Sequence, residues 1–218
     1  MNLSEQTRKL TEDFITSQSE EDQATIQQAF AEILASDFGD NALREGDKAT
    51  DFCLPNARSG ETQLSDLLEN GPVVLNFYRG GWCPYCNLEF KALSDIVPDI
   101  KELGATLVGV SPELPDNSMD TIEKHNLPFE VMSDVGNEVA RQYGIVMKVP
   151  AAMRPLYLQW GLDVPKVNGD DTWELPIPAT YVINSDGYIA LAYVNKNYTE
   201  RLEPSEIISV LKSVAVPA

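Results

Sequence analysis

Two cysteines, Cys83 and Cys86, lie three residues apart at the point where a strand pattern changes into a helical one. Residues 73–78 form an apolar run that predicts a buried strand, and helical spacing then continues to about residue 103. Pro84 favours the first helical position, because the missing N–H would have no partner there. Cys83 is then expected at the N-cap, and both thiols are expected to be exposed at the positive end of the helix dipole.

A thiol at a helix N-terminus has a lowered pKa, so this pair can supply a thiolate near neutral pH and can close a small disulfide. The alternative is half of a zinc site. Four-coordinate zinc would need further ligands, and the chain offers only Cys53 and His125 besides the pair. We therefore predict a redox-active dithiol and no metal site, and we predict that Cys53 is a buried, unreactive thiol.

The chain is strongly acidic, with 34 Asp and Glu against 16 Lys and Arg and a net charge of −18. We therefore expect neither nucleic acid nor an anionic membrane as a partner, because both are negatively charged and would repel the protein. No apolar run reaches the length of a membrane span, and the first 30 residues show no cationic start followed by an apolar stretch. We expect a cytoplasmic protein, in a reducing compartment where a close cysteine pair is more often catalytic than structural.

Residues 1–45 differ in pattern from residues 46–218. A capping signal at Ser19 precedes apolar residues at helical spacing, and Gly39 is a candidate stop, so we expect a helical N-terminal extension. The apolar face of the extension could pack on its own domain or against a partner subunit in a homodimer. Within the main domain, residues 149–176 are rich in proline and glycine and are expected to form an insertion.

Strand and helix patterns alternate through the main domain. A short helix is expected at 64–70, capped by Ser65, and the turn at 184–187 predicts a hairpin between two strands. This order predicts an α/β fold, a three-layer α/β/α sandwich around a mixed sheet. The remaining expected elements are strands at 105–111, 179–183 and 188–194, helices at 117–125, 136–143 and 204–214, and an apolar segment at 129–132.

Several motifs are similar to those of the alkyl hydroperoxide reductase/thiol-specific antioxidant (AhpC/TSA) family of the thioredoxin-fold superfamily, in the peroxiredoxin-like branch with a CxxC motif. They are Leu64-Ser65-Asp66-Leu67, Phe77-Tyr78-Arg79-Gly80-Gly81-Trp82-Cys83-Pro84-Tyr85-Cys86 and Thr180-Tyr181-Val182-Ile183. The similarity runs from about residue 46 to 214. It implies a thioredoxin-like domain with the dithiol at the carboxyl edge of the sheet, and a thiol-based antioxidant activity.

The chain also departs from the patterns of these proteins. Cys86 matches the peroxide-attacking cysteine of peroxiredoxins, and Cys83 replaces their threonine. Pro178 takes the place of a late arginine and resembles the cis-proline of thioredoxins, beside which the backbone of Ile177 would pair with a substrate chain. Asn76 stands where thioredoxins bury an aspartate.

Two catalytic cycles remain open at this point. In disulfide exchange Cys83 attacks a partner disulfide and Cys86 displaces the product. In peroxide reduction Cys86 attacks the O–O bond and Cys83 condenses with the resulting sulfenic acid. Arg79 could supply the cation that stabilises the leaving oxygen, with Arg154 as a weaker candidate, although an arginine before the dithiol could equally brace a loop.

The expected substrate is a hydroperoxide or a disulfide, and the expected electron donor is a thioredoxin- or glutathione-type thiol, with no cofactor required. Trp82 is expected to wall the site, or else to be a packed indole. A non-catalytic alternative is a redox-sensing module, in which the state of the dithiol moves the N-terminal extension.

Overall fold

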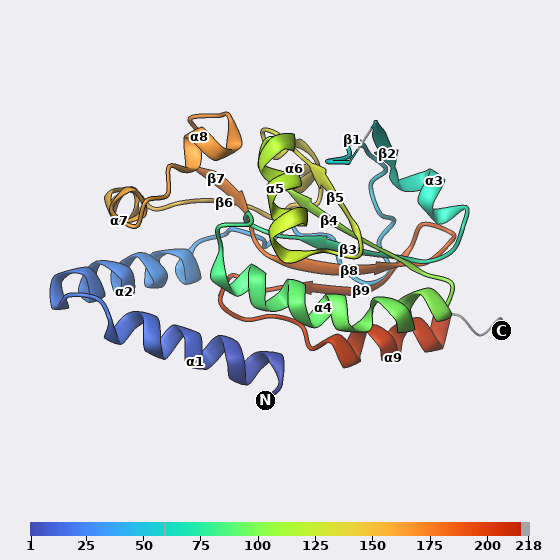
Figure 1. Ribbon diagram of the computed structural model, residues 1–218, viewed down its shortest axis with the longest axis horizontal. Coiled ribbons are helices and arrows are strands. Elements are labelled where there is room, and N and C mark those ends of the chain that lie inside the picture. The colour runs from blue at the N-terminus through green and yellow to red at the C-terminus, as the bar shows by residue number, and fades with distance from the viewer. Residues whose placement is uncertain (59, 215–218) are drawn as a thin grey trace.

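The protein is built around a five-stranded mixed sheet with the strand order β5-β4-β3-β8-β9 (Figure 1). The computed structural model describes residues 1–58 and 60–214. Strands β3, β4 and β5 are parallel, whereas β8 runs antiparallel to β3 and β9 antiparallel to β8. The strands are β3 (Val73–Phe77), β4 (Thr106–Ser111), β5 (Glu130–Ser133), β8 (Ala179–Ile183) and β9 (Ile189–Val194).

Side-chain alternation along the strands gives the sheet two buried faces. In β3, Leu75 and Phe77 point to one face while Val74 and Asn76 point to the other. Helices α3 (Leu64–Leu68) and α6 (Glu138–Gln142) cover the first face, and α4 (Pro84–Glu102), α5 (Pro115–His125) and α9 (Pro204–Val214) cover the second. The predicted α/β/α sandwich is confirmed.

The N-terminal extension consists of two helices, α1 (Leu3–Thr16) and α2 (Glu20–Ala35). The predicted cap of α2 is confirmed, because the Ser19 hydroxyl accepts a hydrogen bond from the Asp22 N–H at 3.1 Å. The helix ends at Ala35, four residues before the expected stop at Gly39. Helix α1 lies against α4 and α2 lies against the segment after β6, so the extension covers its own chain (Figure 1).

The expected insertion has a regular base. Strands β6 (Val146–Lys148) and β7 (Glu174–Pro176) pair as an antiparallel ribbon. Between them lie a 3₁₀ turn η1 (Ala151–Met153) and the short helices α7 (Arg154–Gln159) and α8 (Val164–Asn168). Their apolar side chains form a small third core with Ile26 and Ala29 of α2. The insertion and the N-terminal extension therefore hold each other in place.

Two local predictions are wrong. The Ser65 side chain does not cap α3. Instead, the carboxylate of Asp51 accepts the Ser65 N–H at 2.9 Å. Cys53 is exposed rather than buried, because strand β1 (Cys53–Pro55) pairs with β2 (Glu61–Gln63) in a small ribbon that buries only Leu54. The hairpin turn at 184–187 is as predicted, with the Asn184 N–H bonded to the Tyr188 carbonyl at 2.8 Å.

No helix in residues 1–58 and 60–214 is long and apolar enough to cross a membrane.

Candidate active site

The dithiol lies at the first turn of α4, as predicted. Cys83 is the N-cap with extended backbone angles, Pro84 follows at the start of the helix, and Cys86 is the third helical residue. Two glycines let the chain enter this turn. Gly80 has φ +150°, and a Cβ on Gly81 would lie 1.9 Å from the Thr121 hydroxyl, so α5 approaches the loop too closely for any larger residue.

The expectation of exposed thiols is wrong, because Cys83 and Cys86 are both fully buried. Aromatic side chains from two distant segments cover the start of α4. Tyr157 of the insertion lies against Trp82 with ring centroids 6.1 Å apart, and Tyr198 lies 6.3 Å from Tyr85. Nothing in the local sequence pattern around the dithiol signals these long-range contacts.

Arg79, which the sequence indicated, contacts the first cysteine. Its Nη1 lies 3.7 Å from the Cys83 Sγ, and its Nη2 donates to the Tyr157 hydroxyl. The guanidinium stacks on aromatic rings, 4.1 Å from the centroid of Tyr198 and 5.0 Å from that of Trp82. Arg79 is only 3% exposed, so its charge acts on Cys83 with little screening by water.

A second arginine, Arg201, contacts the second cysteine. Its Nη2 lies 3.2 Å from the Cys86 Sγ, and its Nε donates to the Glu89 carboxylate at 2.6 Å in a buried ion pair. The other oxygen of Glu89 accepts from Asn76, which also donates to the Thr180 hydroxyl. Each sulfur therefore has its own buried guanidinium.

Sequence reasoning missed both Arg201 and Glu89. A signal for Glu89 was present, since it occupies the same helical stripe as Cys86, Phe90 and Leu93, where an acidic residue must be paired. Arg201 comes from the loop before α9, 115 positions from Cys86, and carries no comparable signal.

The two thiols differ in their tendency to ionise. Burial would raise the pKa of Cys83, but a hydrogen bond from the Cys86 thiol and the charges of Arg79 and Arg201 lower it well below its ordinary value. Burial, the hydrogen bond to Cys83 and the negative charge of Cys83 raise the pKa of Cys86 well above its ordinary value. These opposite shifts favour the first ionisation of the coupled pair at Cys83, with the proton kept on Cys86.

A further buried carboxyl, Glu113, lies beside the loop that carries the dithiol. It accepts the Gly81 N–H at 2.9 Å and is 3% exposed. Burial raises the pKa of Glu113 to about 7, and the negative charge of Cys83 contributes to this shift. Sequence reasoning missed this residue, which lies between Pro112 and Leu114 in the short loop from β4 to α5.

The remaining candidates do not join the dithiol as expected. The described residues contain no cis peptide bond, so the bond before Pro178 is trans. The Ile177 N–H is bonded to the Ile145 carbonyl at 2.6 Å, and its side chain packs in the core on the opposite face of the sheet from the cysteines. The Ile177 N–H is therefore not available to a substrate chain in this arrangement. Arg154 lies over Trp173 at 5.4 Å instead of approaching a sulfur.

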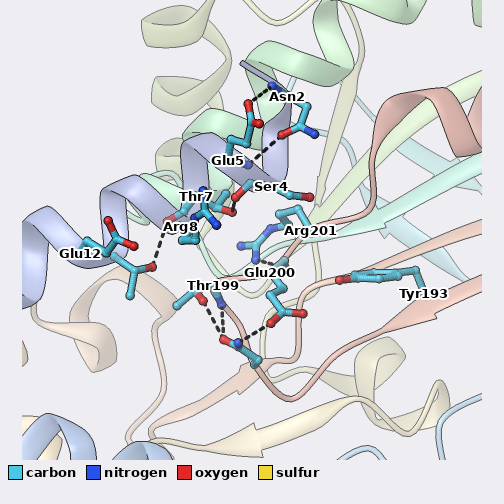
Figure 2. A pocket seen from close by; sticks show the side chains of 12 residues that line it. Asn2, Ser4, Glu5, Thr7, Arg8, Glu12, Tyr193, Thr199, Glu200 and Arg201 are labelled. Carbon is cyan, nitrogen blue, oxygen red and sulfur yellow. Dashed lines mark hydrogen bonds between the residues drawn. The ribbon is translucent and has the colours of Figure 1, made fainter.

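A polar groove of about 480 Å³ separates α1 from the segment that follows β9 (Figure 2). Arg201 lines this groove while its guanidinium reaches Cys86. The other labelled side chains along the groove are Asn2, Ser4, Glu5, Thr7, Arg8 and Glu12 from the α1 side, and Tyr193, Thr199 and Glu200 opposite.

No group of three or more His, Cys, Asp or Glu side chains in the described part of the chain could hold a metal ion.

Comparison with known proteins gives a consistent result. The sequence model of the AhpC/TSA family matches residues 45–192. Peroxiredoxin Q from Populus jackii is 27% identical over 172 residues, which cover 79% of this chain and 70% of that protein. Peroxiredoxin Bcp from Escherichia coli K12 is 30% identical over 105 residues, 48% of this chain and 67% of that protein. The crystal structure of peroxidoxin BcpB from Mycobacterium tuberculosis superposes with a TM-score of 0.62 and 22% identity, over 79% of this chain and 98% of that one.

Proposed function

The chain belongs to the AhpC/TSA family, and we propose that it reduces hydroperoxides with Cys83 as the attacking thiolate and Cys86 as the resolving thiol. Membership of this family makes it a thiol-based antioxidant oxidoreductase. The observation that carries the proposed order is the different pairing of the two guanidinium groups. Arg201, beside Cys86, is ion-paired with Glu89, whereas Arg79, 3.7 Å from the Cys83 Sγ, has no carboxylate partner among the described residues and so favours the thiolate, the nucleophilic form of cysteine, on Cys83.

The proposed cycle has two steps before reduction. The Cys83 thiolate attacks the distal oxygen of R–O–OH and breaks the O–O bond, which gives Cys83–SOH and R–O⁻. Arg79 stabilises the negative charge on the leaving oxygen, which then takes up a proton to become the alcohol. The Cys86 thiol condenses with Cys83–SOH, and this forms the Cys83–Cys86 disulfide and releases one water.

This order reverses the one suggested by position along the chain, in which Cys86 matches the peroxide-attacking cysteine of peroxiredoxins. The raised pKa of Cys86 supports the reversal, because a protonated thiol is a poor nucleophile and a suitable partner for a sulfenic acid. A hydroperoxide is favoured over a protein disulfide as substrate. The Ile177 N–H that would pair with the chain of a disulfide substrate is already bonded to the Ile145 carbonyl.

The cycle closes when a thioredoxin- or glutathione-type thiol donor reduces the disulfide, so it needs no further cofactor. We place this cycle in the cytoplasm, where such donors are reduced, and we propose a homodimer as the assembly. Residues 46–218 would carry the chemistry, and residues 1–45 would act as an extension that covers it.

The order of the cysteines can be tested by rapid-mixing peroxide consumption with single-cysteine variants. Cys83→Ser should abolish the fast consumption of one equivalent of hydroperoxide. Cys86→Ser should retain it and accumulate a sulfenic acid on Cys83, detected by mass spectrometry after dimedone trapping. Cys53→Ser is the matched control, because Cys53 is exposed on β1 and should leave both steps unchanged.

The reverse pattern, with the burst lost in Cys86→Ser and kept in Cys83→Ser, would restore the order suggested by position. Loss of insulin-disulfide reduction in Cys83→Ser, with no peroxide burst in any form of the protein, would identify a disulfide reductase. Steady turnover with either substrate would exclude the non-catalytic sensing module.

A further inference from the structure

An apolar pocket of about 290 Å³ opens beside the dithiol, separate from the polar groove of Figure 2. Segments far apart in the sequence build it. The dithiol loop contributes Arg79, Trp82, Pro84 and Tyr85, which flank Cys83 on both sides. The extension contributes Leu10, Phe14 and Ile26, and the insertion contributes Met153, Tyr157 and Trp160. Residues 1–44 lie outside the segment that matches the family model. Leu10, Phe14 and Ile26 therefore line the pocket from a part of the chain that the family model does not cover.

The walls are held together by aromatic contacts. The ring of Phe14 lies edge-on to Trp160 with centroids 5.2 Å apart, and Tyr157 contacts both Trp160 and Trp82. These contacts join α1 to the insertion across the start of α4. The pocket therefore exists only because the extension is docked.

Two of the residues that line this pocket carry a buried donor with no acceptor among the described residues. The Arg79 Nε and the Trp82 Nε1 are buried, and neither has a hydrogen-bond partner in the described residues. Arg79 also contacts Cys83, so an oxygen atom bound near its guanidinium would lie close to the attacking sulfur. The Trp82 Nε1 lies against Gly80, so the Arg79 guanidinium is the donor that would fix the orientation of a ligand that carries acceptor oxygens.

We infer that this pocket binds the apolar body of a bulky organic hydroperoxide, and that Leu10, Phe14 and Ile26 of the N-terminal helices make the enzyme select such substrates over hydrogen peroxide. The inference rests on the proposed peroxidase function. At about 30 Å³ for each water-sized unit, the pocket holds a ligand of about ten non-hydrogen atoms. A phenyl or branched alkyl group of that size would bury its apolar surface against the aromatic walls, whereas hydrogen peroxide has no apolar surface to bury there.

The binding step can be separated from the chemistry. Cumyl alcohol has the shape of the cumene hydroperoxide product and cannot oxidise a thiol. Its addition to the full-length protein should change the tryptophan fluorescence saturably, because Trp82 and Trp160 line the pocket. Leu10→Trp, which fills the pocket without removing a wall, should weaken this binding about ten-fold or more. Leu34→Ala is the matched control, since Leu34 lies on α2 and is exposed.

Steady-state kinetics then test selectivity. The wild-type protein should have a kcat/KM for cumene hydroperoxide about ten-fold or more above that for hydrogen peroxide. Phe14→Ala should lower the value for cumene hydroperoxide about ten-fold and change the value for hydrogen peroxide less than about two-fold. Leu34→Ala should change neither.

Absence of saturable cumyl alcohol binding, or equal kcat/KM values for the two peroxides in the wild-type protein, would overturn the inference. Saturable binding that Leu10→Trp abolishes, without turnover of either peroxide, would support the pocket and refute the peroxidase function. If Phe14→Ala fails to fold by circular dichroism, the Leu10→Trp comparison of the two peroxides decides the question.

Discussion

Glu113 is the buried carboxyl whose ionisation most directly links the stability of this site to pH. Its pKa is raised to about 7 by burial, against about 4.5 in an unfolded chain. Between these values the folded protein binds a proton that the unfolded chain has lost. The free energy of unfolding should therefore fall as pH rises through this interval. The loss of stability that Glu113 causes should be complete above pH 7.

Replacing Glu113 by glutamine should remove this dependence while keeping an acceptor for the Gly81 N–H. The measured quantity is the free energy of unfolding of Glu113→Gln minus that of the wild-type protein. This difference should be about 2 kcal/mol larger at pH 8 than at pH 5.5. Urea unfolding at the two pH values measures it. Glu123→Gln, which removes an exposed carboxylate from α5, is the control for the loss of one charge. A gain for Glu113→Gln that stays constant with pH would show that the carboxyl is ionised already at pH 5.5.

At the level of single residues, the sequence was informative where the partners are close along the chain. Arg79 is four positions from Cys83, so the spacing alone placed it near the dithiol. Arg201 and Tyr157 reach the same site from distant segments, and no local pattern specifies such contacts. The bond before Pro178 is trans instead of the expected cis, and an Ile-Pro pair in the sequence is compatible with either isomer.

Helix α1 packs against α4 and reaches its first turn, where the Thr11 hydroxyl is hydrogen-bonded to the Tyr85 hydroxyl at 3.1 Å. A carboxylate from a distant segment joins the Asn2–Glu5 capping box at the first turn of α1. Glu203 accepts from the Ser4 N–H at 2.8 Å, the Leu3 N–H at 3.2 Å and the Ser4 hydroxyl at 2.6 Å. These hydrogen bonds lower the pKa of Glu203 despite its partial burial, so the carboxylate is charged at neutral pH. The first turn of α1 therefore has two carboxylate acceptors, Glu203 from just before α9 and Glu5 of the helix itself, which accepts the Asn2 N–H at 3.2 Å.

Removing this contact should loosen α1. Glu203→Ala should speed amide hydrogen exchange in α1 about five-fold, since a lost helix N-terminal acceptor costs about 1 kcal/mol. Exchange in β3 should stay unchanged. Hydrogen exchange with mass spectrometry of peptides from residues 1–18 measures the effect, and Glu206→Ala, which removes an exposed carboxylate from α9, is the control. Equal protection of α1 in both variants would mean that apolar packing and the Asn2–Glu5 capping box hold this helix without Glu203.

The elements themselves were largely predictable, because each carries a local signal. Ser19 starts α2, Pro84 starts α4 and the turn at 184–187 joins β8 to β9, all as expected. What the sequence could not specify is how α1 and α2 close over the dithiol. Their apolar face was visible, but its packing partner lies in the insertion, and only the folded chain brings the two together.

The whole molecule carries far more negative than positive charge. Even if each of the 16 basic side chains were paired, 18 of the 34 acidic side chains would have no cation. The described residues form four ion pairs, of which only the Arg201–Glu89 pair is buried. Most carboxylates therefore face water and repel one another, which destabilises the compact state at low ionic strength.

Salt should relieve this repulsion, because the screening length falls to about 10 Å at 0.1 M ionic strength. Raising NaCl from 0.02 M to 0.5 M should stabilise the wild-type protein by about 1 kcal/mol and raise its Tm by about 2–4 °C. Differential scanning calorimetry measures the shift. Choline chloride at the same ionic strength should give the same rise, since screening does not depend on the identity of the cation. A rise with NaCl alone would point to specific sodium binding, and a flat or falling Tm in both salts would mean that the surface carboxylates are too far apart to repel one another appreciably.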